Sequence, residues 1–232
     1  MKDNIKIWFD SLASKKDSIK KKSDEFDAKK LVNIYSIKTP YGKRFAPREA
    51  FNIGKLDSEK LSSPYVLKVC SSDILHKTEM QGVLLNIDMD SVKDNFKTMQ
   101  SRFPDKNILV ENQTDFMGPE FIIGIIKDPA LGHAIMVGAG GVLTEIYKDT
   151  SFRLAPCSVN EAMDMIDELV LSPIFDNFRG IDLDKKKLAG TISRVSKLAH
   201  DLGDELSQLD INPIVFSNGE WIALDVKVVL EQ

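Results

Sequence analysis

Cysteine is nearly absent from this sequence of 232 residues, in which Cys70 and Cys157 are the only two. Two thiols cannot form the disulfide framework of a small secreted domain, nor a zinc site of several spaced cysteines. Both lie in apolar surroundings, which indicates buried thiols. We therefore expect a protein of the reducing cytoplasm.

The sequence also lacks long apolar runs and an excess of positive charge. No run reaches the roughly 18 apolar residues of a membrane span, and the start "MKDNIKIWFDSL" is too charged for a signal peptide. The formal net charge is −4 and the pI is about 5.5. Strong attraction to nucleic acid or anionic lipid is therefore not expected. With 43% hydrophobic residues, the chain can bury the core of one large or two modest domains.

Helical and strand patterns alternate along the chain. We expect helices within the first ~35 residues, where the charge run from Lys15 to Lys22 is interpreted as a solvated helix face rather than a phosphate-binding patch, because acidic residues such as Asp17 interrupt it. Asp90 is predicted to cap a helix, and Ser158 with Glu161 forms a capping-box pattern. Further helices are predicted at 90–103, 158–172 and 184–202, and strands at 65–71, 82–88, 107–113, 120–129 and around 133–149. The mixture predicts an α+β or α/β fold.

The stretch "GAGG" at 138–141 resembles a dinucleotide fingerprint only superficially. That fingerprint needs a glycine at the sixth position, where this sequence has Leu143, and a following helix. Two interpretations remain open. Gly140 and Gly141 form either a tight turn whose backbone N–H groups face a ligand, or a plain hairpin.

The dipeptide Asn218-Gly219 is a strong signal for a two-residue hairpin turn. If it forms the turn, the numbers of paired residues sum to 437. Asn212 then faces Asp225, and Asp210 faces Lys227. Alternation places one set of residues on the core face: Leu209, Ile211, Val215, Ile222, Leu224, Val226 and Val228.

Asn212 and Asp225, paired across the strands with Cβ atoms ~5 Å apart, could hold one Mg²⁺ ion. The alternative is that they simply belong to the polar, solvated face of the hairpin, which spacing alone favours. Pro213 could also bulge the strand and shift the register.

Three further candidate sites stand out. Lys68 lies inside the apolar run "YVLKV", so it needs either an anionic partner or a place on an edge strand. His76 lies in a polar loop between two predicted strands, where a lone histidine is more often structural. Glu145, Asp149 and Arg153 follow the glycine turn at four-residue intervals, and their neighbours favour a strand leading into a loop over a helix.

Together, several blocks resemble the nucleotide-binding β subunit of ADP-forming acyl-CoA (acetyl-CoA) synthetases, an ATP-grasp family related to the succinyl-CoA synthetase β subunit. The resemblance extends from about residue 26 to residue 230. It rests on four blocks in the same order: "YVLKVCSSDILHKTEMQGVLLNI", "EFIIGIIKDPALGHAIMVGAGGVLTEIYKDTSFRLAP", "LDINPIVF" and "ALDVKVVL". No block alone is specific, but the set is.

The resemblance implies the reaction acyl-CoA + ADP + phosphate ⇌ acid + CoA + ATP. A separate CoA-binding α subunit would carry a first phosphohistidine, in an α2β2 assembly. The loop histidine of the "DILHK" motif, His76 here, would relay the phosphoryl group to the nucleotide. Neutral imidazole suits such a relay near pH 7, since its unperturbed pKa is ~6.5.

The same resemblance assigns other residues. Asn212 and Asp225 would bind Mg²⁺, with Asp210 supporting the metal, and Lys68 would contact nucleotide phosphates. Glu111 and Glu120 would lie near adenine and ribose. The implied phosphate and loop contacts are Gly140, Gly141, Glu145, Asp149 and Arg153.

The implied fold is an ATP-grasp fold, in which two α+β subdomains enclose a nucleotide. We expect a charged helical extension at 1–25, a first subdomain at 26–105 and a second at 106–232. The sequence departs from the family at Lys127, where arginine is usual, and in the polar stretch "ILVENQTDFMGPE". Rival functions are a malate- or succinate-type CoA ligase and a nucleotide-sensing module. His76 together with Asn212 and Asp225 argues against the sensing module, which has no use for a relay histidine.

Overall fold

The computed structural model describes residues 2–13, 21–51, 60–74, 77, 79–141 and 148–231. The chain forms two compact units. Unit 1 comprises Met1–Ser23, Asp27–Thr39 and Asp115–Gln232, and unit 2 comprises Asp24–Phe26 and Pro40–Thr114. In the described part of the chain, no helix is both long and apolar enough to cross a membrane.

These boundaries differ from the predicted ones at 25 and 105. The first helix is an integral part of unit 1 rather than an appended extension, because Trp8 and Leu12 are buried in the core of that unit. Residues 14–20, which make up most of the charge run, lie outside the described residues, so its interpretation as a solvated helix face stays a prediction. Asp24 and Glu25, which follow the run, are both buried.

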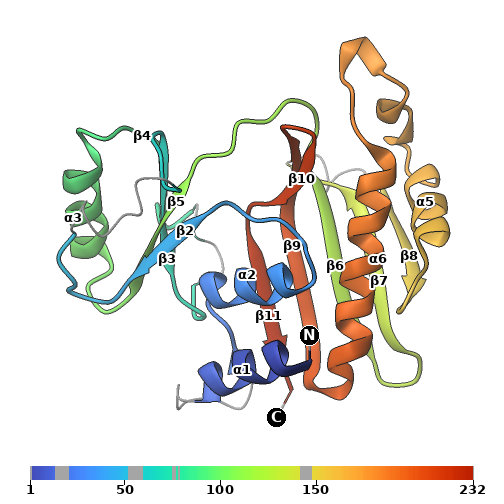
Figure 1. Cartoon of the computed structure of the whole chain (residues 1–232), viewed down its shortest axis with the longest axis horizontal. Helices are drawn as coiled ribbons and strands as arrows, with labels where there is room; N and C mark the ends of the chain where they lie inside the picture. Colours follow the sequence, from blue (N-terminus) through green and yellow to red (C-terminus); the bar gives the residue numbers. More distant parts are fainter. Residues whose placement is uncertain are drawn as a thin grey trace. The chain divides into compact units, whose positions relative to one another are not determined.

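Unit 1 is built on a seven-stranded antiparallel sheet (Figure 1). Its strand order is β1-β11-β9-β6-β7-β8, and β10 pairs with β9. The strands are β1 (Lys21–Lys22), β6 (Phe121–Asp128), β7 (Gly132–Ala139), β8 (Thr150–Leu154), β9 (Leu206–Ser217), β10 (Glu220–Ala223) and β11 (Val226–Leu230). The helices are α1 (Lys2–Ala13), most of α2 (Glu25–Ile34), α5 (Val159–Asp167) and α6 (Lys185–Leu202), with 3₁₀ turns at Ser172–Phe175, Phe178–Gly180 and Gly203–Glu205.

Helices α5 and α6 contact strands β6, β7 and β8 (Figure 1). The apolar side chains that alternate along the strands, such as Ile123, Ile125 and Leu209, pack in one buried cluster with those of the helices, such as Met165 and Ile192. The side chains on the other face of these strands lie outside that cluster. This is the ordinary arrangement of a sheet that helices cover on one face.

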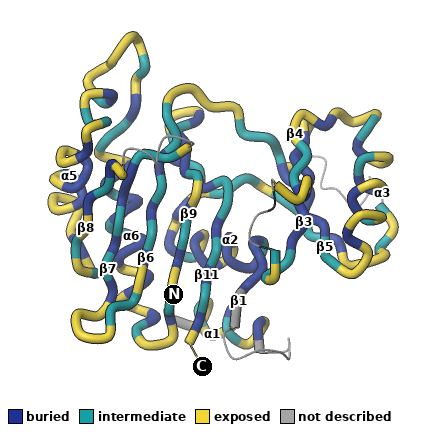
Figure 2. The backbone as a smooth tube through the Cα atoms, turned by 180° about the vertical axis from the view of Figure 1, so that it is seen from behind, coloured by how far each residue is buried: buried dark blue, intermediate teal, exposed yellow. Residues whose placement is uncertain are grey.

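Unit 2 is a four-stranded antiparallel sheet with α3 (Val92–Arg102) on one face. Its strand order is β2-β5-β3-β4, and the strands are β2 (Gly42–Phe45), β3 (Tyr65–Cys70), β4 (Val83–Ile87) and β5 (Asn107–Asn112). All six residues of β3 are buried, so the strand is dark blue along its length in Figure 2. Tyr65, Leu67 and Val69 pack toward α3, while Lys68 alternates to the other face.

Local signals in the sequence explain several element boundaries. Both hydrogen bonds of the capping box between Ser158 and Glu161 are present at the start of α5. The prediction that Asp90 caps α3 was wrong, because Ser91 occupies that position and the backbone N–H of Ser91 donates to Asp88 at 2.7 Å. Asp128 accepts bonds from the next two backbone N–H groups of the β6–β7 turn, at 2.8 and 2.9 Å.

Candidate functional site

The pairing predicted for the β9–β10 hairpin is confirmed. Phe216 pairs with Trp221 across the turn, and further along Asp210 pairs with Lys227, so the residue numbers sum to 437 in both cases. The backbone N–H of Asn212 donates to the carbonyl oxygen of Asp225 at 3.1 Å. Pro213 does not disturb this register between the two chain segments.

The predicted core face of the hairpin is only half right. Ile211 and Ile214, three residues apart, both belong to the helix-covered core, as do Ala223 and Val226 on the partner segment. Because side chains alternate with a period of two, a spacing of three switches the face at this level on both segments. The tip of the hairpin therefore packs Trp221 and Ala223 toward that core, rather than Ile222 and Leu224 as expected.

This switch of faces falls at the candidate metal site. The β-ladder is interrupted between β10 and β11 at Leu224 and Asp225, and the register of β9 against β6 shifts at the same level. On the other segment, Asn212 and Pro213 occupy this level. Irregular positions of this kind often redirect side chains at functional sites.

The carboxyl groups of Asp210 and Asp225 influence each other electrostatically. Burial raises the pKa of Asp210, the nearby Lys227 ammonium lowers it, and the negative charge of Asp225 raises it further. A divalent cation would stabilise two carboxylates that are held this close. Among the described residues there is no group of three or more His, Cys, Asp or Glu that could hold a metal. Two carboxylates and an amide nevertheless fit Mg²⁺, which keeps several waters and uses few protein ligands.

Three of the expected nucleotide-binding residues meet at the same end of this sheet. The N–H of Gly140 donates to the carbonyl oxygen of Glu120 at 2.6 Å, and a Cβ on Gly140 would lie 2.8 Å from the backbone of Glu120. Gly141 has a φ of +78°, a conformation that favours glycine. Gly140 is thus required by a close backbone approach and Gly141 by its backbone conformation. Phe121, which follows Glu120, pairs with Ile214 and so connects this turn to β9.

Asp149 and Arg153 both have protein partners. Both carboxylate oxygens of the buried Asp149 accept backbone N–H groups, from Val170 at 2.7 Å and Leu171 at 2.9 Å. The guanidinium of Arg153 forms a bidentate ion pair with Glu168, the residue that follows helix α5. These are contacts within the protein, and the phosphate and loop contacts expected of Asp149 and Arg153 stay a prediction.

Lys68 lies in a buried cluster of charges in unit 2. Its Nζ is 2.8 Å from Glu25 Oε1 and 3.0 Å from Glu111 Oε2, and Glu25 Oε2 also pairs with Lys77. The expectation of an anionic partner is confirmed, and the edge-strand alternative is wrong because β3 lies between β4 and β5. The partners are carboxylates of the protein, so burial alone does not argue for nucleotide phosphate at Lys68. Glu111, expected near adenine or ribose, is one of them.

Two predicted residues, His76 and Glu145, lie outside the described residues. The other two histidines are accounted for. His133 is buried and its Nε2 lies 2.8 Å from the carbonyl oxygen of Leu206, and His200 lies in the last turn of α6.

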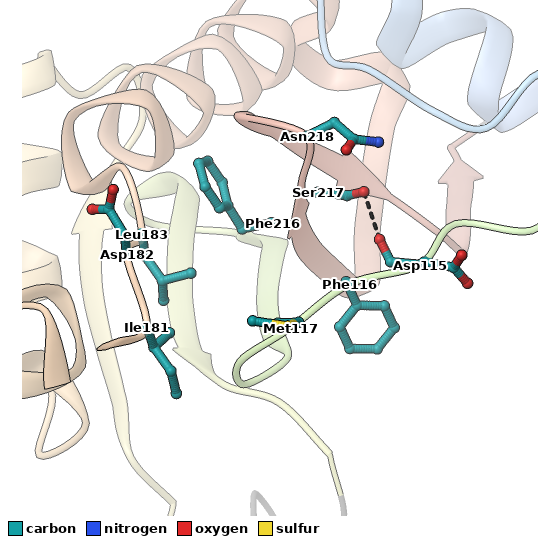
Figure 3. A pocket seen from close by; sticks show the side chains of 9 residues that line it. All are labelled: Asp115, Phe116, Met117, Ile181, Asp182, Leu183, Phe216, Ser217 and Asn218. Carbon is teal, nitrogen blue, oxygen red and sulfur yellow. Dashed lines mark hydrogen bonds between the residues drawn. The ribbon is translucent and has the colours of Figure 1, made fainter. Parts of the chain in front are cut away.

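A pocket of about 280 Å³ opens at the tip of the β9–β10 hairpin (Figure 3). Ser217 Oγ donates to the carbonyl oxygen of Asp115 at 2.6 Å across its rim. None of the predicted site residues lines it. Its lining comprises Asp115, Phe116, Met117, Ile181, Asp182, Leu183, Phe216, Ser217 and Asn218.

Glu25 and Lys77 were missed as site residues. Lys77 had a usable signal, since it follows His76 directly in the "DILHK" motif. Glu25 had none, because a glutamate in a charged stretch is typical of an exposed helix face and its partner Lys68 is 43 positions away.

Comparison with known proteins agrees with this geometry. Residues 14–230 match the family described as the ATP-grasp domain. This match over most of the chain defines an ATP-grasp protein. The β subunit of acetate–CoA ligase (ADP-forming) I from Pyrococcus furiosus is 34% identical over 214 residues, which cover 89% of this chain and 90% of that protein. The chain belongs to the family of ADP-forming acyl-CoA synthetase β subunits.

Solved structures are similar over most of their length. The crystal structure of PH1788 from Pyrococcus horikoshii Ot3 has a TM-score of 0.86 and 29% identity, covering 100% of this chain and 99% of that one. The dinucleotide forming acetyl-coenzyme A synthetase 1 of Ca. Korarchaeum cryptofilum has a TM-score of 0.76 and 28% identity, covering 89% and 92%. It was solved with coenzyme A and Mg-AMPPCP, with its phosphohistidine segment pointing towards the nucleotide binding site.

Proposed function

We propose that this chain carries the nucleotide site of an ADP-forming acyl-CoA synthetase, which catalyses acyl-CoA + ADP + phosphate ⇌ carboxylic acid + CoA + ATP. The observation that carries the proposal is the pairing of Asn212 with Asp225, with Asp210 beside them, at an interruption of the sheet. The turn formed by Gly140 and Glu120 lies at the same end. Membership of the synthetase β-subunit family supports it.

Asn212 and Asp225 would hold Mg²⁺, and Asp210 would support it from the next pair along the strands. The ion, when bound, supplies positive charge to the phosphate oxygens. The residues of the chain supply orientation. Asn212 and Asp225 are tied together through their backbones, so their side chains project from one fixed level of the sheet. The turn at Gly140 and Gly141 is the proposed phosphate-binding turn; because the N–H of Gly140 donates to Glu120, the N–H of Gly141 is the proposed phosphate donor.

His76 is the proposed phosphoryl carrier. In the direction of ATP formation, a nitrogen of its imidazole attacks the phosphorus of the phosphohistidine proposed on the α subunit. A P–N bond to His76 forms while the P–N bond to that donor histidine breaks. The phosphoryl group then passes to ADP as the P–N bond to His76 breaks. Imidazole suits both steps because it is a good nucleophile when neutral and also a good leaving group.

The remaining assignments are part of the same proposal. Lys68 would contribute to phosphate binding in addition to its carboxylate partners, and Glu111 and Glu120 would lie near adenine and ribose. Glu145 would contact phosphate. Asp149 and Arg153 would act indirectly, by holding the segment around α5 in place.

A CoA-binding α subunit is the proposed partner, in an α2β2 assembly, because related proteins carry the name of β subunits. The complex would work in the cytoplasm. The two buried cysteines, both free thiols, fit a reducing compartment.

Co-purification of the chain with a CoA-binding subunit encoded beside it, followed by a carboxylic-acid panel, tests the proposal. We expect CoA consumption that depends on the acid, on ATP and on the presence of both subunits. The chain alone, assayed in parallel, should bind ADP without turning over CoA. Nucleotide binding with no acid-dependent CoA consumption in the complex would instead support the nucleotide-sensing alternative.

A further inference from the structure

The segment that carries the proposed relay histidine is attached to a buried charge cluster. Lys77, the residue after His76, is only 5% exposed in its side chain, and its Nζ pairs with Glu25 Oε2. Glu25 is 1% exposed and uses its other oxygen to bind Lys68 at 2.8 Å. The carboxylate of Glu25 therefore connects Lys77 of the loop to Lys68 of the inner strand β3.

The backbone of Lys77 is held as well. Its carbonyl oxygen accepts from the N–H of Gly82 at 2.6 Å, and the carbonyl oxygen of Gly82 accepts from Val69 of β3 at 2.8 Å. A Cβ on Gly82 would lie 2.5 Å from Val69 Cγ1 and 3.0 Å from the carbonyl oxygen of Lys77. The position of Gly82 thus allows the end of the loop to lie directly against the strand.

Burying four charges is a poor way to gain stability, since apolar residues of similar volume commonly do as well or better. Such a cluster does, however, fix positions, because an ion pair has directional hydrogen bonds that apolar contacts lack. Met80 and Leu85, in the same region of the chain, are largely exposed. Burial of the ammonium of Lys77, which precedes both of them in sequence, therefore needs a specific reason.

We infer that Lys77 and Glu25 are positioning residues for the phosphoryl relay, an inference that rests on the proposed function of His76. Consecutive Cα atoms are separated by about 3.8 Å, so fixing Lys77 limits where the preceding residue, His76, can lie. Phosphoryl transfer depends mainly on in-line placement of the reacting groups. The pair of Lys77 with Glu25 provides a fixed point for that placement.

The test compares Glu25→Gln and Lys77→Met with the wild-type chain. Gln keeps the size of Glu25 and removes its charge, and Met keeps the length of Lys77. The initial rate of His76 labelling from γ-labelled ATP at saturating concentration should fall about tenfold or more. The KM for ATP should stay unchanged in Lys77→Met, because Lys77 is not one of the proposed nucleotide contacts. Lys77→Arg, which restores the charge, should recover part of the rate.

Asp24→Asn is the matched control. Asp24 is the neighbouring buried carboxylate, and its ion pair is with Arg44 at 2.7 Å. It should label His76 at close to the wild-type rate. Wild-type labelling in Glu25→Gln overturns the inference. Equal losses in Glu25→Gln and Asp24→Asn also overturn it, because the effect would then reflect general destabilisation of unit 2.

Cleavage by trypsin after Lys77 gives a second measurement that does not depend on catalysis. In the wild-type chain the buried Lys77 should be cut slowly, and in Glu25→Gln it should be cut at least several-fold faster. If the wild-type chain does not label His76 at all, the proposed relay fails, while the cleavage ratio still decides whether Glu25 anchors Lys77. An unchanged ratio means that it does not.

Discussion

Replacement of Lys68 by methionine, written Lys68→Met, perturbs the most highly charged part of the buried interior. The ammonium lies between Glu25 and Glu111, at 2.8 and 3.0 Å, and the three side chains are 10%, 1% and 2% exposed. Among the described residues, the ion pairs of Lys68 and Lys77 join these two lysines to the carboxylates of Glu25 and Glu111. Methionine preserves the bulk of the stem but leaves the two carboxylates with one lysine.

The expected cost follows from that imbalance. Removing one partner of a buried ion pair typically costs about 3–5 kcal/mol, because the remaining charge stays desolvated. In a chain of this size each kcal/mol lowers Tm by about 2–4 °C, so the expected decrease is on the order of 10 °C. The double variant Lys68→Met with Glu111→Gln restores neutrality and should recover much of the loss.

Thermal and urea unfolding followed by circular dichroism measure both effects. Lys97→Met is the control, since Lys97 is an exposed lysine 3.5 Å from Asp94 and its loss should cost less than about 1 kcal/mol. If Lys68→Met unfolds at the wild-type temperature, or if the double variant is no more stable than the single one, the cluster is not energetically coupled.

Three other outcomes are expected. Asp225→Ala should remove most of the Mg²⁺-dependent turnover while Tm changes little, since the backbone bond to Asn212 survives; wild-type turnover would refute the metal assignment. Gly140→Ala should lower both Tm and ADP affinity by calorimetry, because its Cβ would lie 2.8 Å from neighbouring backbone; unchanged values would refute the close approach. Arg153 lowers the pKa of Glu168 to about 2, so the pair stabilises the fold above the ordinary carboxyl pKa and this contribution is lost as pH falls toward 2. Glu168→Gln should therefore be less stable than wild type at pH 7, with a difference that shrinks between pH ~4.5 and 2; a constant difference would contradict it.

Features determined by neighbouring residues could be predicted from the sequence. The turn at Asn218-Gly219 sets the pairing of β9 with the returning segment, so Asn212 and Asp225 could be matched by arithmetic alone. The capping box at Ser158 is equally local. The need of Lys68 for an anion follows from the cost of burying a charge.

Features that depend on distant contacts could not be predicted. Glu25 binds Lys68 across 43 positions of sequence, and nothing near either residue indicates the pair. Asp149 is of a residue type that is common in phosphate and metal sites. Its carboxylate oxygens, however, accept hydrogen bonds from the backbone N–H groups of Val170 and Leu171, which lie 21 and 22 positions later in the sequence. The change of core face near Pro213 arises where β9 also shifts its register against β6. The sequence pattern of the β9–β10 hairpin does not indicate how β9 pairs with β6.

Labelling of the isolated chain with γ-labelled ATP and Mg²⁺ tests the central claim, that His76 relays the phosphoryl group, most directly. The account predicts an acid-labile, base-stable adduct on His76 in the wild-type chain without any partner subunit. His76→Asn should still bind ADP with wild-type affinity by calorimetry, but it should take up no label, because an amide cannot carry the phosphoryl group. Equal labelling of both proteins, or full synthetase activity of His76→Asn with its partner, would contradict the account.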